Sequence, residues 1–168
     1  MATNTFLSSS SSTSEWNYDV ILSYIEEETV NNFTSKLYTS LESANIKAFK
    51  EDAENFKRGD QISDSLMKGI KESRCAIIIF SRNYASSTRC LEELSLIMEC
   101  WEKLGQRVIP VFLMGVTGSD IRRQTGSFEE PFRQLEECFD REMVKRWRSD
   151  LKIAGELCGW NLKDVPNG

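Results

Sequence analysis

The stretch Cys75-Ala76-Ile77-Ile78-Ile79-Phe80 decides the fold class of this chain. All of its side chains are apolar and isoleucine dominates, which is typical of a strand that is covered on both faces. Shorter or more mixed apolar runs lie at residues 18–23, 46–49 and 107–112. Because helical segments separate these runs, the sequence predicts an α/β protein with a parallel sheet and right-handed crossover connections.

Apolar residues spaced three or four apart predict the helices. The positions that share a helix face are Phe33, Leu37 and Leu41; Ile62, Leu66 and Ile70; Leu91, Leu94, Met98 and Trp101; and Val144, Trp147, Leu151, Ala154 and Cys158. Ser86-Ser87 is a candidate N-cap of the third helix, and Gly105 and Gly159 are expected to end the third and the last. Residues 115–134 predict only a loop and a short helix.

The carboxyl ends of the strands are where function is expected. Ligands of such sheets bind beyond these ends, at the point where the strand order reverses. We therefore expect functional residues directly after Ser23, Phe49, Phe80 and Phe112. Pro110 cannot donate a backbone hydrogen bond, so it should lie near a sheet edge or a bulge.

The composition limits the functions that are available to the chain. Its 168 residues, 40% of them hydrophobic, fit one globular domain. It contains no histidine, which excludes Ser-His-Asp and Cys-His catalysis and histidine-bearing zinc sites. A net charge of −5 makes nucleic acid an unfavourable partner, and no apolar run is long enough for a membrane span. Five cysteines without a C-x-x-C pair predict a reducing compartment, the cytoplasm or the nucleus, and no metal site.

Two carboxylates, Glu92 and Glu93, lie in the opening turns of the predicted helix that follows Phe80. Glu93 sits beside the apolar stripe of Leu91 and Leu94. An acid that faces the strand ends there could stabilise an oxocarbenium-like sugar during cleavage of a glycosidic bond. Spacing alone favours a plainer interpretation, in which acids early in a helix complement its dipole.

Local residues exclude two common functions of this architecture. A phosphoacceptor receiver needs an aspartate at the end of its third strand, where this chain has Phe80-Ser81-Arg82. A flavodoxin-type phosphate loop needs hydroxyls and glycine after the first strand, and Ile25-Glu26-Glu27-Glu28 supplies neither.

The sequence from Asn17 to Lys163 resembles the Toll/interleukin-1 receptor (TIR) domain of plant intracellular immune receptors. The stretches that carry the resemblance are Tyr18–Ser23, Lys57–Ile62, Ala76–Tyr84, Cys90–Leu94, Arg122–Phe128, Trp147-Arg148 and Gly159-Trp160. Several stretches match in order, so the resemblance is more specific than any single motif. It implies a TIR domain over residues 17–163, between a Ser-rich leader at 1–16, expected to be disordered, and a tail at 164–168.

The resemblance implies a flavodoxin-like TIR fold with a five-stranded, mostly parallel sheet and helices on both faces. It also implies a signalling module that associates with other TIR domains and, in many members, cleaves NAD+ at the nicotinamide glycosidic bond. Glu93 matches the family's catalytic glutamate, and NAD+ would be a substrate rather than a cofactor. The positions that match self-association surfaces are Ser35, Lys36, Gly159 and Trp160.

The chain departs from the family where the dinucleotide would bind. The family's Phe-Arg-Gly-Glu-Asp-Thr-Arg becomes Tyr24–Val30, so Ile25 and Glu26 replace an arginine and a glycine. A carboxylate at ~6 Å from a phosphate, at an effective dielectric of ~20, costs roughly 3 kcal/mol, or about a hundredfold in affinity. Arg89 replaces an aromatic residue that would stack on adenine, although its planar cation can also stack. The positions that would bind substrate are Tyr24, Ile25, Glu26, Arg58, Gly59 and Arg89, with Arg58 and Gly59 in the loop that gates the pocket in the family.

Two functions from different classes remain open. The first is a TIR-type NAD+ glycohydrolase or cyclase that signals cell death, which Glu93 and the matching core favour. The second is an interaction module, an adaptor or decoy, that has kept the fold and lost efficient chemistry. Ile25, Glu26 and Arg89 favour weak or absent catalysis, because one retained carboxylate cannot orient a dinucleotide.

Overall fold

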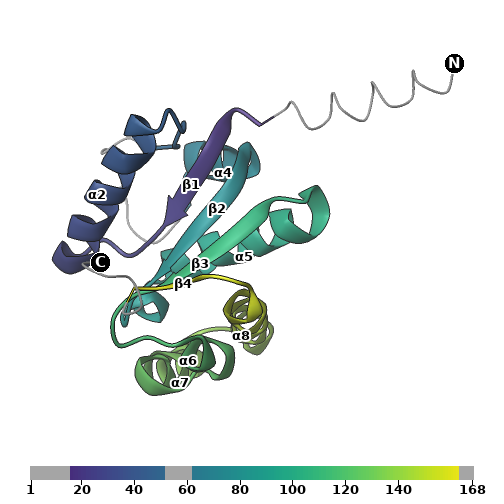
Figure 1. Ribbon diagram of the computed structural model, residues 1–168. Helices are drawn as coiled ribbons and strands as arrows, with labels where there is room; N and C mark the ends of the chain where they lie inside the picture. The colour runs from purple at the N-terminus through teal and green to yellow at the C-terminus, as the bar shows by residue number, and fades with distance from the viewer. Residues whose placement is uncertain (1–15, 52–61, 163–168) are drawn as a thin grey trace, which may run out of the picture.

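The computed structural model describes residues 16–51 and 62–162, so the predicted leader and tail lie outside the described residues. The strands are β1 (Tyr18–Ser23), β2 (Ser73–Phe80), β3 (Arg107–Phe112) and β4 (Trp160–Asn161). The helices are α2 (Glu28–Ser43), α4 (Asp64–Lys71), α5 (Thr88–Leu104), α6 (Gly118–Arg123), α7 (Glu129–Cys138) and α8 (Arg141–Glu156), with short 3-10 helices η1 (Tyr84–Ser86) and η2 (Gly126–Phe128). Strands and helices alternate along the chain, which confirms the predicted α/β class (Figure 1).

The sheet is parallel, with the spatial order β1-β2-β3-β4. The predicted strand at 46–49 contributes one parallel bridge, from Ala48 to Val20, on the side of β1 away from β2. It forms no longer strand because the backbone N–H of Lys47 donates to the Asp19 carboxylate at 2.7 Å instead of to a strand carbonyl. With this bridge counted, the segments have the flavodoxin-like order, which reverses at β1.

Both faces of the sheet are covered, as the apolar strands predict. Successive side chains of a strand point to opposite faces, and they enter two different cores here. The core beneath α2 contains Val20, Leu22, Val30, Ile79 and Val111. The larger core on the other face contains, among others, Ile21, Ile78, Phe80, Leu91, Leu94, Phe112 and Trp147. Figure 1 shows α2 standing apart from the other helices, which agrees with this division.

The ends of α5 confirm the predicted cap and stop. The Ser87 hydroxyl accepts a hydrogen bond from the backbone N–H of Cys90 at 3.2 Å, which satisfies one free donor of the first turn. Gly105 follows the helix with φ at 72°, a left-handed conformation that glycine adopts without steric cost. Both ends of α5 are therefore fixed, and with them the position of Glu93 on this helix.

The predicted end of the last helix is wrong. α8 ends at Glu156, and Leu157 is already extended, so Cys158 is not part of the helical face. Gly159 does not stop the helix; it lies against β3, where a Cβ atom would approach the Pro110 carbonyl oxygen to 2.2 Å. β4 begins to pair with β3 at Val111, one residue after Pro110, which confirms that the proline lies at an edge position on that side.

The region after β3 contains more helix than the sequence predicts. Residues 115–134 were expected to hold a loop and one short helix, but α6, η2 and the first part of α7 occupy them. α7 is hard to recognise because Phe132 and Leu135 are its only buried residues within the described chain, too few for a clear periodic pattern.

Candidate functional site

Glu93 lies in the second turn of α5, beyond the carboxyl ends of β1 and β2, and its side chain is turned into the protein. The residue is only 6% exposed, between the fully buried Leu91 and Leu94. The first turn of α5 contains no acidic residue, so the interpretation of Glu93 as a complement of the helix dipole loses its basis. Because the helix dipole does not explain this acid, the burial of its carboxyl group requires another explanation.

The surroundings of Glu93 favour its neutral form. Burial raises the pKa of the Glu93 carboxyl to about 8, and the nearby Glu51 carboxylate adds to that increase. The Arg89 guanidinium and a hydrogen bond with the Ser23 hydroxyl oppose it. The protonated form of Glu93 therefore predominates at neutral pH, and a cationic group that enters the site would favour ionisation.

Arg89 connects the two carboxyl groups. Its Nη2 atom forms an ion pair with Oε2 of Glu51, and its Nε atom lies 3.7 Å from Oε2 of Glu93. The side chains are 11% exposed for Arg89 and 3% for Glu51, so water screens the pair poorly. The predicted role of Arg89 was stacking on adenine, whereas in this structure the guanidinium is engaged by carboxylates.

Glu51 is the residue of this cluster that the sequence did not single out. Its Oε2 atom binds Arg89, and its Oε1 atom accepts a hydrogen bond from the Ser63 hydroxyl at 2.8 Å. Ser63 is in turn the N-cap of α4, where its hydroxyl accepts from the Leu66 backbone N–H. The sequence predicts functional residues directly after Phe49, which is where Glu51 lies. Nothing in the sequence identified Arg89 on α5 as its partner.

Two hydroxyl groups form the floor of the site at the end of β1. The Ser23 and Tyr84 hydroxyls are 2.8 Å apart, and the Tyr84 hydroxyl donates to the Cys90 carbonyl at 3.1 Å. The Tyr84 proton goes to Cys90, so Tyr84 can only accept from Ser23, and Ser23 donates to it only while its single proton is not donated to the Glu93 carboxylate. Burial raises the pKa of Tyr84, with smaller contributions from Cys90 and Glu93. These contacts place β1, η1 and α5 around one small volume.

Tyr24 and Tyr38 bring the loop after β1 and the middle of α2 close to the site. Tyr38 donates a hydrogen bond to Tyr24, and burial raises the pKa of both phenols. The charge of Glu93 adds to both increases, as does that of Glu26. The predicted residue Tyr24 therefore lies within electrostatic reach of Glu93, and Tyr38 is a neighbour that the sequence did not reveal.

The acidic loop after β1 lies at the rim rather than inside. Ile25 is half-buried and packs against both cores. Glu26 is exposed and accepts a hydrogen bond from Asn31 at 2.9 Å, and Glu27 accepts one from Asn83 at 2.9 Å. Glu26 therefore influences the site by its charge, in part by raising the pKa of Tyr24. Arg58 and Gly59 lie outside the described residues, so the predicted gating loop is not placed.

The four predicted self-association residues lie on two separate elements. Ser35 and Lys36 are exposed on α2. Trp160 is 64% exposed in β4, which is unusual for so large an aromatic side chain. Gly159 beside it has the structural task described above, the close approach to Pro110.

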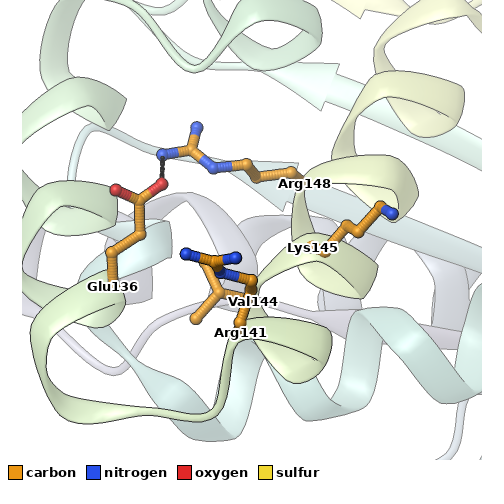
Figure 2. A pocket seen from close by; sticks show the side chains of 5 residues that line it. All are labelled: Glu136, Arg141, Val144, Lys145 and Arg148. Carbon is orange, nitrogen blue, oxygen red and sulfur yellow. Dashed lines mark hydrogen bonds and ion pairs between the residues drawn. The ribbon is translucent and has the colours of Figure 1, made fainter.

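Among the pockets that lie away from this cluster within the described residues are two of more than 400 Å³. One, of about 420 Å³, opens at the carboxyl ends of β2 and β3 against the start of α2, and its lining includes Glu27, Ser81, Arg82, Asn83, Leu113 and Met114. The other, of about 510 Å³, lies between α7 and α8 (Figure 2), and is lined by Glu136, Arg141, Val144, Lys145 and Arg148. Figure 2 shows the Arg148 guanidinium directed at Glu136, with which it forms an ion pair at 2.5 Å. Neither pocket shares a lining residue with the Glu93 cluster.

Over residues 16–51 and 62–162, no three His, Cys, Asp or Glu side chains gather so that they could hold a metal ion. Within the same ranges, no helix has the length and apolar character that crossing a bilayer requires. All five cysteines are free thiols.

The comparisons with known proteins concern the chain as a whole. Residues 17–168 match the family model described as TIR domain. The chain is 43% identical over 168 residues to the disease resistance protein RPV1 of Vitis rotundifolia, with 97% of this chain and 12% of that protein covered. It is 44% identical over 155 residues to the TMV resistance protein N of Nicotiana glutinosa, with 91% and 13% covered. The chain thus spans about an eighth of the length of these relatives.

A solved structure shows the same fold. The TIR domains of the activated Roq1 resistosome that directly recognises the pathogen effector XopQ superpose with a TM-score of 0.79 at 42% identity. The match covers 90% of this chain and 92% of that one. The likeness therefore extends over nine-tenths of the chain.

Proposed function

The chain belongs to the TIR domain family, and from that premise we propose that it is a plant immune signalling domain that cleaves NAD+ at the nicotinamide glycosidic bond through Glu93. The observation that carries the catalytic part is the burial of Glu93 at the carboxyl ends of β1 and β2, beside the reversal of strand order. The comparisons support the immune part, since relatives of this chain are disease resistance proteins.

The chemistry follows from the charge of the bond that breaks. Nicotinamide leaves NAD+ as a neutral molecule, and positive charge moves onto the ribose as the bond lengthens. A carboxylate held in a buried site stabilises that charge more strongly than one in water, because little solvent screens it. Binding of the cationic nicotinamide ring of the substrate favours the ionised form of Glu93, so the substrate helps to generate the group that acts on it.

We further propose that the domain works as an assembly with other TIR domains in the cytoplasm or nucleus. The Roq1 neighbour is a set of TIR domains within a resistosome, which supports association of this kind. Exposed Trp160, Ser35 and Lys36 are the contact residues that we propose for it. The free thiols suit a reducing compartment.

A second function, an interaction module without catalysis, is favoured by one specific observation. Arg89 holds a positive charge 3.7 Å from Glu93 in the place where a cationic substrate would gain most from the carboxylate. The acidic rim at Glu26 adds repulsion toward the phosphates of a dinucleotide. In this alternative the domain signals only through contacts with other TIR domains.

Release of nicotinamide distinguishes the two functions. The purified chain, clustered at high concentration, is mixed with NAD+ and compared with the variants Glu93→Ala and Glu92→Gln. Glu92 is the adjacent half-buried carboxylate, so its variant controls for the loss of one acidic residue on α5. Release by the parent and by Glu92→Gln but not by Glu93→Ala supports the enzyme. Equal release by all three, or none by the parent, contradicts it.

A further inference from the structure

We infer that the pocket between α7 and α8 binds a small anion that carries a diphosphate group, such as a nucleoside diphosphate. The pocket has a volume of about 510 Å³, and the described residues that line it are Glu136, Arg141, Val144, Lys145 and Arg148 (Figure 2). It shares no residue with the cluster around Glu93. The inference therefore does not depend on the proposed cleavage of NAD+.

The pocket is positively charged although the chain as a whole is acidic. Of its five described lining residues, three are cations and one is an acid, in a chain with a net charge of −5. The acid, Glu136, is already neutralised, because its Oε1 atom pairs with Nη2 of Arg148 at 2.5 Å. Two positive charges remain in excess, those of Arg141 and Lys145.

These two cations are available to an anion from outside the chain. Within residues 16–51 and 62–162, no carboxylate lies within ion-pair distance of Arg141 or Lys145. Asp140 and Glu142 flank Arg141 in the chain, but neither pairs with it. Both cationic side chains belong to exposed residues.

The placement of these cations works against the stability of the helix. α8 begins at Arg141, so this cation occupies the first turn, at the positive end of the helix dipole. Lys145 follows one turn later and Arg148 three residues after it, spacings at which like charges repel. Local rules of helix stability are thus broken twice in one pocket, which is expected where side chains serve binding rather than folding.

Arg148 forms a fixed wall of the pocket. Its Nη1 atom donates to Oε1 of Gln124 at 3.2 Å, and its Nη2 atom pairs with Glu136. The guanidinium also lies over the ring of Phe132, 4.7 Å from the ring centroid. Because these contacts already hold the side chain, little further ordering of this wall is needed when a ligand binds.

The directions of the two unpaired cations favour a ligand with two anionic groups. Figure 2 shows the Arg141 guanidinium below the Arg148–Glu136 pair, whereas the Lys145 side chain extends away from it. Two linked phosphate groups can contact both cations at once, and a single phosphate contacts one at a time. The planar guanidinium suits two phosphate oxygens, and the ammonium acts as a point charge.

The size of the pocket favours a small molecule over a polyanionic surface. Ligand pockets have volumes of roughly 300–1,000 Å³, and this one leaves room for a sugar beside the phosphates. Nucleic acid or an anionic membrane would also meet the rest of the chain, whose net charge of −5 opposes such extended contacts. Val144 is the one apolar residue among the described lining residues, so we expect little discrimination between bases.

NMR of the backbone amides of the full chain tests the inference, with inorganic pyrophosphate, ADP and inorganic phosphate as probes. The signals of Glu136, Val144 and Lys145 report on this pocket, and those of Ser23 and Glu93 report on the other cluster. The thermal unfolding midpoint of each sample is measured with and without pyrophosphate. None of these measurements uses NAD+ cleavage, so failure of the proposed function leaves their outcome unaffected.

The variants are Arg141→Gln and Lys145→Gln. Lys152→Gln is the matched control, because Lys152 is an exposed cation on the same helix that does not line the pocket. We expect pyrophosphate and ADP to shift the signals of the pocket and to bind about fivefold more tightly than phosphate, since a second cation takes part. Each variant should weaken pyrophosphate binding by about fivefold, and the control should leave it unchanged.

Without ligand, Arg141→Gln should unfold at a slightly higher temperature than the parent, because it removes a cation from the first turn of α8. A lower unfolding temperature would overturn the inference, since the cation would then serve the fold. Pyrophosphate that shifts only the signals of Ser23 and Glu93, or that binds both variants as tightly as the parent, would also overturn it.

Two polyanions complete the test, a short DNA duplex and vesicles of phosphatidylserine and phosphatidylcholine. Both should bind more weakly than pyrophosphate, because the acidic chain repels an extended anionic surface. Binding of either one that is tighter than that of pyrophosphate, and that is lost in Arg141→Gln and Lys145→Gln, would contradict a small-molecule site and assign the pocket to a polyanion.

Discussion

Nε of Arg89 lies 3.7 Å from Oε2 of Glu93, so the chain carries its own cation beside the carboxyl group that we propose for catalysis. At this position the resemblance leads us to expect an aromatic side chain. Arg89 therefore places a positive charge where a flat neutral ring is expected, and Glu51 and Glu93 both pair with that charge. Activity of this domain therefore depends on how charge is distributed around Glu93, and the predictions below test that distribution.

The acidic rim should weaken NAD+ binding. We predict that Ile25→Arg combined with Glu26→Gly lowers the KM for NAD+ by about tenfold, because a carboxylate is exchanged for a cation near the phosphates. Glu26 is exposed, so solvent reduces the effect below that of a buried charge. The measurement is nicotinamide release at several NAD+ concentrations. An unchanged KM would show that these side chains do not face the dinucleotide.

Folding stability should depend on pH through Glu93. The pKa of its carboxyl group is about 8 in the folded chain and near the ordinary 4.5 when unfolded, so the folded state holds the proton more tightly. Stability from this group is fully present below about 4.5 and is lost as the pH rises toward 8. Glu93→Gln removes this loss and should raise the unfolding free energy at pH 7 by about 3 kcal/mol.

Urea unfolding of the parent and Glu93→Gln between pH 4 and pH 9 measures this effect. The two curves should converge at the acidic end and separate as the pH rises. Glu92→Gln is the control, and it should follow the parent. Parallel curves for the parent and Glu93→Gln over the whole range would mean that Glu93 is not buried as an acid.

Gly159 should be required for folding rather than for contacts between copies. A Cβ atom at this position would lie 2.2 Å from the Pro110 carbonyl oxygen, and backbone cannot yield as a flexible side chain can. We predict that Gly159→Ala lowers the midpoint of thermal unfolding by several degrees, which corresponds to about 1–3 kcal/mol. Gly105→Ala is a useful comparison, because no atom lies within 4 Å of its Cβ position and only the positive φ is strained. Full stability of Gly159→Ala would contradict the structural role.

Trp160 should contribute to self-association and little to stability. Its side chain is 64% exposed, so Trp160→Ala removes little buried area within one copy. We predict an unchanged unfolding midpoint and a weaker increase of mass with concentration in light scattering. Trp147→Ala, by contrast, truncates a 1% exposed core residue and should unfold the domain. Equal association of Trp160→Ala and the parent would exclude β4 from the contact surface.

The sequence predicts those parts of the fold that depend on regular patterns. The strands at 18–23, 75–80 and 107–112 were found because their residues alternate between two cores, and the α5 cap at Ser87 because capping is local. β4 was missed because two residues carry no period and pair through the backbone alone. The close approach of Gly159 to Pro110 was missed for the same reason, since it joins distant segments without a pattern.

The candidate site also contains residues that the sequence singles out and residues that only the fold reveals. Glu93 could be proposed from the sequence because it lies beside an apolar stripe and matches a family motif, and Tyr24 because it belongs to the stretch that matches the family's loop after the first strand. Glu51 was not found because its importance comes from a tertiary contact with Arg89, 38 residues later in the chain. The family resemblance predicted a planar cation near the site, but only the fold shows that two carboxyl groups pair with it.

The most direct test of the account is the pH profile of nicotinamide release by the clustered domain. Ionised Glu93 is the active form, so kcat/KM should rise with pH through the titration of the free carboxyl group, about 8. Glu93→Gln should show no such rise and no release above the background. Release by Glu93→Gln with the same pH profile as the parent would contradict the account, because the reaction would then use another group.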